Sequence, residues 1–410
     1  MANSQNPIAC MMKDLSHLHL STLAIHAGES PDPHTKASSP NLVMSTTFVA
    51  DPDSTFSVEG LEEDAPFFYT RWGNPTVAQL EQKLAALEGV EDCITFASGM
   101  AAITALMLHT LSQGDHILIS DVTYAAAAEL TLDLLPRMGI SVTRVNMSDP
   151  EKVREAISPQ TKLIYAETPC NPLIRLTDIQ AISSIAKRAG ILLAVDSTFA
   201  TPVATQPIEL GADLVIHSLT KYIGGHGDAV GGALLGKSNL LAQIRQKIAI
   251  RTGGIISPFN AWLIMRGMAT LPIRMMAHEK AAKTVADFLE NHPKVTRVIY
   301  PGLPSHPQYD LAKRQMKNFS GMISFQVKNG PEMARQLAER LQVIHYAVSL
   351  GHHRSLIFYL PTRDMLQNSF HLNAEQAKAY REYAGEGIFR LSVGIEDGGD
   401  LCGDLERALE

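Results

Sequence analysis

Residues 191–221 have the sequence ILLAVDSTFATPVATQPIELGADLVIHSLTK, which contains two short apolar runs that each lead into polar residues. The first run, Ile191-Leu192-Leu193-Ala194-Val195, leads into Asp196, and the second, Asp213-Leu214-Val215-Ile216, leads into the segment that carries Lys221. Continuous apolar runs of this length are typical of strands that are buried on both faces of a parallel sheet. Ligands bind beyond the carboxyl ends of such strands, so Asp196 and Lys221 are candidate functional residues.

The same pattern extends on both sides of this segment. Short apolar runs alternate with helical segments from residue 93 onward, which predicts an α/β fold with a mostly parallel sheet and helices on both faces. The other runs are residues 93–97, 116–119 and 162–165, and the helical segments are 101–111, 125–135, 150–156 and 179–189. A further helix is expected at 77–87, and the apolar segment 229–235 is strand-like.

Three parts of the chain differ in their patterns. Residues 1–70 are rich in Ser, Thr, Pro, His and Asp and lack periodicity, so we expect an extended N-terminal arm that is disordered or lies on a partner. Residues 71–265 hold the alternating pattern. Residues 266–410 are expected to form a smaller α+β domain. They continue a long helical pattern that begins near residue 257 and ends near 289, with strands at 295–300, 322–327 and 387–393 and helices at 331–341 and 374–384.

The composition of the 410 residues excludes several classes of protein. Hydrophobic residues make up 45% and charged residues 19%, as in soluble proteins with large cores. The formal net charge of −7 argues against a nucleic-acid-binding protein. Cys10, Cys93, Cys170 and Cys402 form no CxxC pair, so we expect reduced thiols in a cytoplasmic protein and no zinc site. The apolar patch at residues 7–12 is too short for a signal peptide, and no stretch is long enough to span a membrane.

Lys221 lies between small hydroxyl residues, Ser218 and Thr220, and a glycine-rich run. A lysine forms an imine with an aldehyde cofactor, and neighbouring hydroxyls hold a phosphate; pyridoxal phosphate requires both. Asp196 would suit a protonated pyridine nitrogen, because a buried carboxylate is costly unless it is paired. An N-cap is the other interpretation of Asp196.

Three more strand ends carry candidate residues. Ser98-Gly99-Met100 leads directly into a helix, which indicates either a phosphate-binding helix N-terminus or a simple cap at Ser98. Tyr124 offers a flat ring for stacking on a cofactor, although a lone tyrosine is more often part of the core or the rim of a site. Glu167 precedes a loop with two prolines, in which Asn171 either donates a hydrogen bond to a phenolate oxygen or belongs to a rigid turn.

A nucleotide-binding alternative comes from residues 231–238, GGALLGKS, which satisfy the P-loop pattern. A P-loop requires a strand before the first glycine and a helix directly after the Lys-Ser pair. The interior of this segment is apolar and strand-like, and residues 236–239 are typical of a turn that leaves the strand. We therefore expect no P-loop here.

Together, three motifs resemble the Cys/Met-metabolism family of pyridoxal-phosphate enzymes, which includes methionine γ-lyase, cystathionine γ-lyase, cystathionine γ-synthase and O-acylhomoserine sulfhydrylase. The motifs are the lysine segment 217–228, Tyr-x-Arg-x-x-Asn-Pro-Thr at 69–76 and Arg-Leu-Ser-Val-Gly-Ile-Glu-Asp at 390–397. The resemblance runs from about residue 21 to the C-terminus. It implies the fold-type I PLP-dependent transferase fold with a mostly parallel, seven-stranded central sheet, and a cytoplasmic homotetramer, a dimer of dimers with active sites shared between subunits.

The resemblance also implies residue roles. Lys221 would form a covalent aldimine with pyridoxal 5′-phosphate and shuttle protons, and Tyr124 would stack on the ring and protonate the leaving group. Arg390 and Ser349 would bind the substrate carboxylate beside Val348. Tyr69 and Arg71 would reach the phosphate of a neighbouring subunit. The implied cofactor-binding residues are Tyr69, Arg71, Ser98, Gly99, Met100, Tyr124, Glu167, Asn171, Asp196, Ser218, Thr220 and Lys221, and no metal ligand is expected.

The implied reaction is the α,γ-elimination of a sulfur-containing amino acid of the methionine or cystathionine type, which gives a 2-oxo acid, ammonia and a thiol. Val348 stands where cystathionine-cleaving members often carry a glutamate, which favours a neutral thioether. The alternatives are γ-replacement, as in cystathionine γ-synthase or O-acylhomoserine sulfhydrylase, and γ-elimination of a non-sulfur analogue such as canavanine. The sequence departs from the family pattern at three places: at Ala125-Ala126, at Arg354, which stands in place of an acidic residue, and at residues 356–365. The adjacent His352 and His353 rarely face one metal ion.

Overall fold

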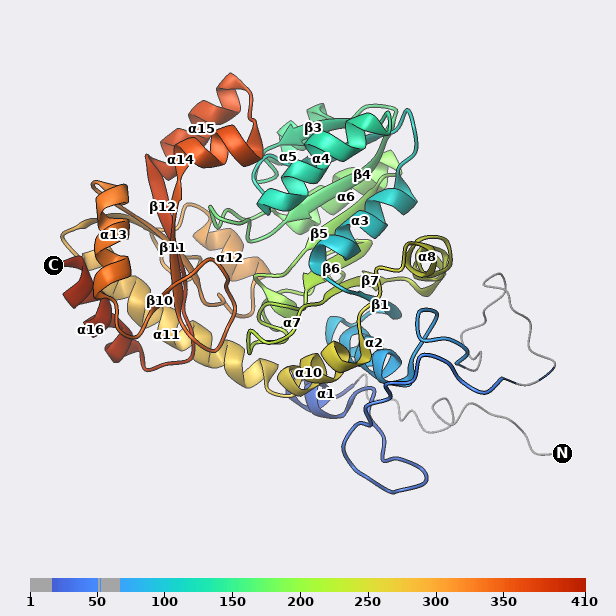
Figure 1. The fold of residues 1–410 in the computed structure, drawn as a ribbon. Helices are drawn as coiled ribbons and strands as arrows, with labels where there is room; N and C mark the ends of the chain where they lie inside the picture. The colour runs from blue at the N-terminus through green and yellow to red at the C-terminus, as the bar shows by residue number, and fades with distance from the viewer. Residues whose placement is uncertain (1–16, 51, 53–66) are drawn as a thin grey trace.

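Parallel strands form the centre of the molecule, as the apolar runs predict. The computed structural model describes residues 17–50, 52 and 67–410, and seven of its strands form one sheet in the order β1-β7-β6-β5-β4-β2-β3 (Figure 1). Neighbours from β3 to β6 are parallel, whereas β7 is antiparallel to both β6 and β1. The strands are β1 (Asp92–Phe96), β2 (His116–Ser120), β3 (Ser141–Val145), β4 (Thr161–Glu167), β5 (Leu192–Asp196), β6 (Leu214–Ser218) and β7 (Gly232–Gly236).

Helices cover both faces of this sheet because side chains alternate along each strand. In β4, Leu163 and Tyr165 contribute to one buried cluster, and Ile164 and Ala166 contribute to another. The helices α3 (Gly99–Thr110), α4 (Ala125–Arg137) and α8 (Ser238–Ile244) pack in the first cluster. The opposite face is covered by α5 (Pro150–Glu155) and α6 (Ile179–Ala189), and further along by α2 (Pro75–Glu88) and α10 (Pro258–Met268).

A second, smaller sheet confirms the predicted α+β arrangement of the C-terminal part. Its order is β10-β11-β12-β9-β8, with only the β10–β11 pair parallel. The long helix α11 (Leu271–Asn291) packs on it together with α13 (Gly330–Arg340) and α16 (Gly398–Leu409) (Figure 1). The remaining elements are β8 (Val295–Ile299), α12 (Tyr309–Gln315), β9 (Met322–Val327), β10 (His345–Tyr346), β11 (Leu356–Pro361), α15 (Ala374–Ala384) and β12 (Gly387–Ser392), with short helices at 201–204, 250–252 and 362–364 and π-helices at 245–249 and 365–370.

The described part of the predicted arm begins with a short helix, α1 (Leu20–His26), that docks on α2. Lys83 of α2 is fully buried, and its Nζ donates to the carbonyl oxygens of Ala24 (3.1 Å) and Ile25 (3.0 Å) and pairs with Glu29. The chain after α1 loops away from both sheets (Figure 1). Residues 1–16, 51 and 53–66 of the predicted arm lie outside the described residues, and the domain boundaries after residues 70 and 265 stay predictions.

The expected turn at residues 236–239 is wrong, because Lys237 is the N-cap of α8 and the helix begins at Ser238. The glycines of the P-loop pattern nevertheless lie within β7, a hydrogen-bonded strand. A P-loop needs a loop at this place, so that its N–H groups are free to surround a phosphate. The nucleotide-binding alternative therefore has no structural support.

Two further features concern the helices. The predicted long pattern from 257 to 289 is divided into α10 and α11 at Ala269 and Thr270. Among residues 17–50, 52 and 67–410, no helix is both long and apolar enough to cross a membrane.

Candidate active site

Lys221 lies just beyond the carboxyl end of β6, where the chain reverses to form the antiparallel β7. The reversal requires left-handed backbone at Gly225 and Gly227, which glycine adopts at little cost. The Nζ of Lys221 donates a hydrogen bond to Ser349 Oγ over 3.3 Å. Burial and, secondarily, the charge of Arg390 lower the pKa of Lys221, because both disfavour the ammonium form. Lys221 therefore offers a free amine at lower pH than an exposed lysine does.

Asp196 ends β5 beside Lys221's strand and is buried. Its Oδ2 accepts from the Tyr165 hydroxyl (3.1 Å), and its Oδ1 accepts from the Thr198 N–H (3.0 Å). Burial raises the pKa of Asp196, and no cation within the described ranges forms an ion pair with it. A cationic ring nitrogen would supply the missing partner.

The N-terminus of α3 is pressed against the ends of β6 and β7. A Cβ at Gly232 would lie 2.2 Å from the Ser98 carbonyl oxygen, and a Cβ at Gly99 would lie 3.3 Å from Ser218 Oγ. The Ser98 hydroxyl accepts from the Ala101 N–H (3.1 Å) and so caps the helix. The first-turn N–H groups of this 12-residue helix, including that of Met100, together with the helix dipole suit a phosphate.

Glu167, at the end of β4, joins the two loops that carry Tyr124 and Asn171. Its Oε2 accepts from the Thr123 hydroxyl (2.5 Å) and the Tyr124 N–H (2.7 Å), and its Oε1 accepts from the Asn171 N–H (2.6 Å). Burial and then the nearby charge of Asp196 raise the pKa of Glu167. The three donors hold the carboxylate in place, so Glu167 fixes the positions of Tyr124 and Asn171.

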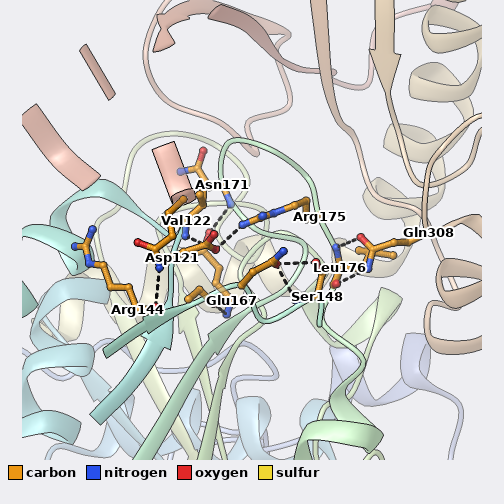
Figure 2. A network of polar contacts seen from close by, with 12 residues as sticks. Asp121, Val122, Arg144, Ser148, Glu167, Asn171, Arg175, Leu176 and Gln308 are labelled. Atoms are coloured by element: carbon orange, nitrogen blue, oxygen red, sulfur yellow. Dashed lines mark hydrogen bonds and ion pairs between the residues drawn. The ribbon is translucent and has the colours of Figure 1, made fainter. Parts of the chain in front are cut away.

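A buried ion pair supports these loops from the side. Asp121 follows β2, and its Oδ1 accepts from Arg175 Nη2 over 2.5 Å, with both side chains almost fully buried. Figure 2 shows Asp121, Glu167, Asn171 and Arg175 gathered at one edge of the central sheet. The pair ties the end of β2 to the loop between β4 and α6, which also carries Asn171.

Arg390 lies in β12 and points into the same region. Its Nη1 donates to Asn171 Oδ1 (3.0 Å), and its Nη2 donates to the carbonyl oxygen of Val348, whose side chain is exposed. Arg390 is buried, and burial lowers its pKa to about 10. No carboxylate of the described residues forms an ion pair with it. A buried guanidinium with amide and carbonyl partners alone is a binding site for an anion, above all a carboxylate.

The structure brings most of the predicted site residues to this junction of the two sheets. Three of them lie apart from it: Thr220, Tyr69 and Arg71. Thr220 Oγ1 exchanges hydrogen bonds with the backbone of Gly231 (3.1 and 3.2 Å). Tyr69 and Arg71 are exposed; Arg71 lies over the Tyr69 ring at 5.5 Å and donates to the Ile250 carbonyl oxygen (2.7 Å). Neither bonds to the group around Lys221 among the described contacts, so their polar ends are available to a neighbouring molecule.

Sequence reasoning missed several contacts of the site. Thr123, Tyr165 and Thr198 support the carboxylates but carry no motif of their own. His352, whose Nε2 lies 3.0 Å from Ser349 Oγ, was considered only as one of two adjacent histidines that rarely face one metal ion. Its place in the sequence, three residues after Ser349, was the available signal, because a turn of that length brings the two side chains together.

These residues fit pyridoxal phosphate in each of its parts. A lysine with lowered pKa suits the aldehyde, a buried carboxylate that lacks a cation suits the ring nitrogen, and a helix N-terminus beside Ser218 suits the phosphate. The close approach of Gly232 and Gly99 keeps that helix N-terminus near the lysine strand.

Comparison with known proteins gives the same result over nearly the whole chain. Residues 21–410 match the family described as Cys/Met metabolism PLP-dependent enzyme. The chain is 40% identical to canavanine gamma-lyase of Pseudomonas canavaninivorans (97% of this chain, 98% of the relative) and 40% identical to L-methionine gamma-lyase of Fusobacterium nucleatum subsp. nucleatum (95% and 98%). It is 42% identical to cystathionine gamma-synthase of Mycobacterium tuberculosis (95% and 96%). The crystal structure of metB from Corynebacterium glutamicum superposes with a TM-score of 0.86 at 37% identity and covers 97% of this chain and 99% of that one.

Proposed function

This chain belongs to the Cys/Met metabolism PLP-dependent enzymes, and we propose that it is a lyase that performs α,γ-elimination on a sulfur-containing amino acid. The products are a 2-oxo acid, ammonia and a thiol. L-methionine gamma-lyase is among its relatives at 40% identity. The main candidate substrate is methionine or a similar neutral thioether, with cystathionine as the larger variant.

Residues of the central sheet would hold the cofactor. Lys221 would bind it covalently, Asp196 would pair with the ring nitrogen, and the N-terminus of α3 with Ser98, Gly99, Met100 and Ser218 would bind the phosphate. Thr220, assigned to the phosphate from the family resemblance, would need to exchange its bonds with the Gly231 backbone to do so. Tyr124 and Asn171 would lie beside the cofactor, positioned by Glu167. When bound, pyridoxal phosphate withdraws electrons from the substrate and thereby makes its Cα proton acidic.

The observation that carries the proposal is the unpaired, buried guanidinium of Arg390 next to Lys221. Arg390 Nη2 donates to the carbonyl oxygen of Val348, and Lys221 Nζ donates to the side chain of the next residue, Ser349, so the two cations flank the same short segment. A substrate α-carboxylate on Arg390 would place its Cα on the side of Lys221. The hydrogen bonds from Arg390 to Asn171 and to the Val348 carbonyl oxygen fix the plane of the guanidinium.

The proton steps belong to Lys221 and Tyr124. Once the substrate amine has replaced it, Lys221 Nζ is a free amine; it removes the Cα proton and later the Cβ proton. Tyr124, whose hydroxyl interacts electrostatically with Arg390, donates a proton to the leaving sulfur. Lys221 Nζ must release the proton taken from Cα before it can take the proton from Cβ. The ease of deprotonating Lys221 therefore affects the rate of turnover.

The mouth of the site supports a neutral side chain. Val348 is 63% exposed beside Arg390 and offers an apolar surface instead of a charge. Methionine, with an uncharged methylthio group, suits this surface better than cystathionine, whose far end carries an ammonium and a carboxylate that would need partners.

Two other substrates and one other reaction have support of their own. A canavanine gamma-lyase is as similar to this chain as the methionine enzyme is, so canavanine is the second candidate substrate. The 42% identity to a cystathionine gamma-synthase supports γ-replacement on an O-acylhomoserine. The same lysine serves both reactions: in replacement a thiol adds at Cγ, whereas in elimination no nucleophile adds there and hydrolysis gives the 2-oxo acid and ammonia.

We also propose a homotetramer in the cytoplasm. The exposed Tyr69 and Arg71, which bond to no part of the Lys221 group, support active sites completed by a second copy of the chain. The described cysteines, Cys93, Cys170 and Cys402, are free thiols, as is usual in a reducing compartment.

A substrate panel tests the function. The purified enzyme is incubated with methionine, cystathionine, canavanine and O-acylhomoserine, with and without added thiol, and 2-oxobutyrate, pyruvate and ammonia are measured. We expect 2-oxobutyrate and methanethiol from methionine without added thiol. The Lys221→Ala variant, which should lose turnover and the visible absorbance of lysine-bound cofactor, is the control. If only canavanine gave product, elimination of canavanine would replace elimination of methionine as the function. If product formed only with added thiol, γ-replacement would replace it. If no compound gave 2-oxobutyrate, the γ-lyase proposal would be refuted.

A further inference from the structure

A tight turn of the C-terminal domain reaches across to Lys221. Residues 349–352 are held on one side by the hydrogen bond from the Gly351 N–H to Ser392 Oγ (2.8 Å) and on the other by the bond from the His353 N–H to the Gly225 carbonyl oxygen (2.9 Å). Gly351 has φ of 72°, and a Cβ there would lie 2.6 Å from the Tyr222 nitrogen. The turn therefore packs directly against the backbone of the lysine segment.

This turn connects three polar atoms by two successive short contacts. Lys221 Nζ lies 3.3 Å from Ser349 Oγ, and Ser349 Oγ lies 3.0 Å from His352 Nε2. When Lys221 is an ammonium, it donates to Ser349 Oγ, and the Ser349 hydroxyl donates to His352 Nε2. His352 then accepts at Nε2 and carries its proton on Nδ1.

The imidazole of His352 has a defined position. Its ring lies over Gly227, where a Cβ would come within 2.7 Å of His352 Cε1 and 2.8 Å of Nδ1. Gly227 has φ of 74°, so its left-handed backbone and its missing side chain both make room for the ring. His352 is half-buried, so its ring touches the lysine segment on one side and solvent on the other.

The charges around His352 keep it neutral while Lys221 is charged. Burial lowers the pKa of His352, as do the neighbouring Lys221 and His353, whereas Asp228 raises it. A proton on His352 and one on Lys221 repel each other across Ser349, so the pair holds a single proton more readily than two.

We propose that His352 is a positioning residue that accepts protons from Lys221 through Ser349 and thereby returns Lys221 to its free-amine form during turnover. The Ser349 proton moves to His352 Nε2 as the O–H bond breaks, and a Lys221 proton moves from Nζ to Ser349 Oγ. Lys221 becomes neutral, Ser349 is regenerated, and His352 becomes an imidazolium that releases its Nδ1 proton to water. The role of His352 in turnover rests on the proposed function. The coupling between the protonation of His352 and that of Lys221 holds whatever reaction the enzyme catalyses.

The coupling is tested first, without substrate. The full chain, free of cofactor and labelled with ¹³C at histidine Cε1, is titrated by NMR, and the His352 signal is identified by its loss in His352→Gln. In Lys221→Ala, which removes the repelling charge, the titration midpoint of His352 should rise by about 0.5 to 2 pH units. An unchanged midpoint would overturn the proposal, whether or not the enzyme proves to be a γ-lyase.

The relay is tested in the loaded enzyme, with whichever substrate of the panel turns over. His352→Gln keeps a hydrogen-bond acceptor but takes no proton, so we expect kcat to fall about tenfold or more with KM little changed. The decline of kcat at acidic pH should disappear, and less solvent deuterium should enter Cα of the recovered substrate per turnover. Ser349→Ala should show the same loss of deuterium entry, whereas His353→Gln, a neighbouring histidine without a bond to Ser349 among the described contacts, should keep the parent deuterium entry. A His352→Gln enzyme that retains the acidic decline and the parent deuterium entry would contradict the relay.

Discussion

Arg390 shows how one side chain selects the class of ligand. Its burial would be costly for an isolated charge, and only neutral oxygens accept from it among the described residues. The site therefore gains most from a ligand that brings a carboxylate, and amino acids do so. The ion pair between a substrate carboxylate and Arg390 would both bind the substrate and stabilise the buried guanidinium.

Replacing Arg390 by lysine separates its charge from its geometry. Arg390→Lys keeps a cation but loses the planar fork that contacts Asn171 and the Val348 carbonyl oxygen. We expect KM for the amino-acid substrate to rise about 10- to 100-fold, which corresponds to the loss of about 1.5–3 kcal/mol from a charged hydrogen bond, with a smaller change in kcat. Steady-state kinetics measure both values.

Arg354, an exposed arginine just before β11, gives the matched control: Arg354→Lys should leave KM unchanged. A large fall in kcat with unaltered KM in Arg390→Lys would contradict the assignment of Arg390 to the substrate carboxylate.

A second residue-scale prediction concerns His278, which is fully buried and whose Nδ1 lies 2.8 Å from the Val393 carbonyl oxygen. Burial lowers the pKa of His278 to about 4 from the ordinary value of 6.5. Because the unfolded chain takes up this proton first, the stabilisation is complete above pH 6.5 and is lost as the pH falls from 6.5 toward 4. The expected loss from this group is about 3 kcal/mol.

Denaturant unfolding at several pH values measures this effect, with His278→Gln as the comparison. The variant keeps an N–H donor for Val393 but cannot titrate, so its free energy of unfolding should fall less steeply between pH 6.5 and 4. Parallel curves for the two proteins would show that other groups cause the acid destabilisation.

At the scale of elements, the contact of α3 with β7 determines where the proposed phosphate site lies. The backbone of Ser98 and Gly99 crosses β7 at Gly232, and no side chain fits between them. The crossing holds the N-terminus of α3 beside Ser218 at the end of β6. The position of a helix terminus thus depends on a glycine in a strand more than 130 residues away.

Gly232→Ala should disrupt this crossing. The added Cβ would overlap the Ser98 carbonyl oxygen and Gly99 Cα, both of which are backbone atoms, so we expect at least about 2 kcal/mol of destabilisation and a lower content of bound cofactor. Unfolding curves and the cofactor-to-protein ratio report the two effects.

The control is Gly403→Ala in α16, where an added Cβ meets no atom within 4 Å. This change should stabilise the helix by up to about 1 kcal/mol and leave the cofactor content unaltered. Normal cofactor content in Gly232→Ala would show that the phosphate site does not depend on the crossing.

The elements that the sequence predicts are those with strong periodicity. The apolar runs that became β1, β2, β4, β5 and β6 are buried on both faces, and α6, α15 and β9 have the predicted bounds. The edge strand β3 was missed because its residues Ser141–Val145 are mostly half-exposed and lack a continuous apolar run. The helix α16 was missed because Gly398, Gly399 and Gly403 are poor helix formers, and packing on the second sheet decides its conformation.

The site was predictable where it follows strands and not where it comes from a turn. Asp196 and Glu167 end buried strands, so fold class alone brings them together. Ser349 lies 128 residues from Lys221. Family resemblance predicted a role for Ser349 beside Arg390 at the substrate carboxylate, and its hydrogen bond with Lys221 was not predicted. Family resemblance gave no indication of a role for His352. Its connection to Lys221 depends on how the turn at residues 349–352 packs on the lysine segment.

At the scale of the whole molecule, the candidate active site lies where two sheets meet. Lys221 and Asp196 come from the central sheet, and Arg390 and Ser349 come from the C-terminal part. Tyr69 and Arg71 lie elsewhere on the surface of the same chain, which is why the proposal assigns them to the site of a second copy.

Complementation between inactive variants tests this sharing. Lys221→Ala and Arg71→Ala should each have little activity, but subunits mixed after mild dissociation would form pairs in which one site has both residues intact. For random pairing, about a quarter of all sites should recover. Activity of the mixture measures recovery, and each variant dissociated and reassociated alone is its control. A mixture no more active than its components would mean that Arg71 serves its own chain.

The antiparallel β7 has a consequence for how the chain folds. β1 is the first strand of the central sheet to leave the ribosome, and its one neighbour in the described sheet is β7, which begins at Gly232. During synthesis, β1 must wait for roughly 140 more residues, on the order of ten seconds, before it can pair. This long-range closure is entropically costly, so the edge of the sheet should form late. The same pairing brings α3 to Ser218, and a nascent chain therefore acquires its phosphate site only after β7 is made.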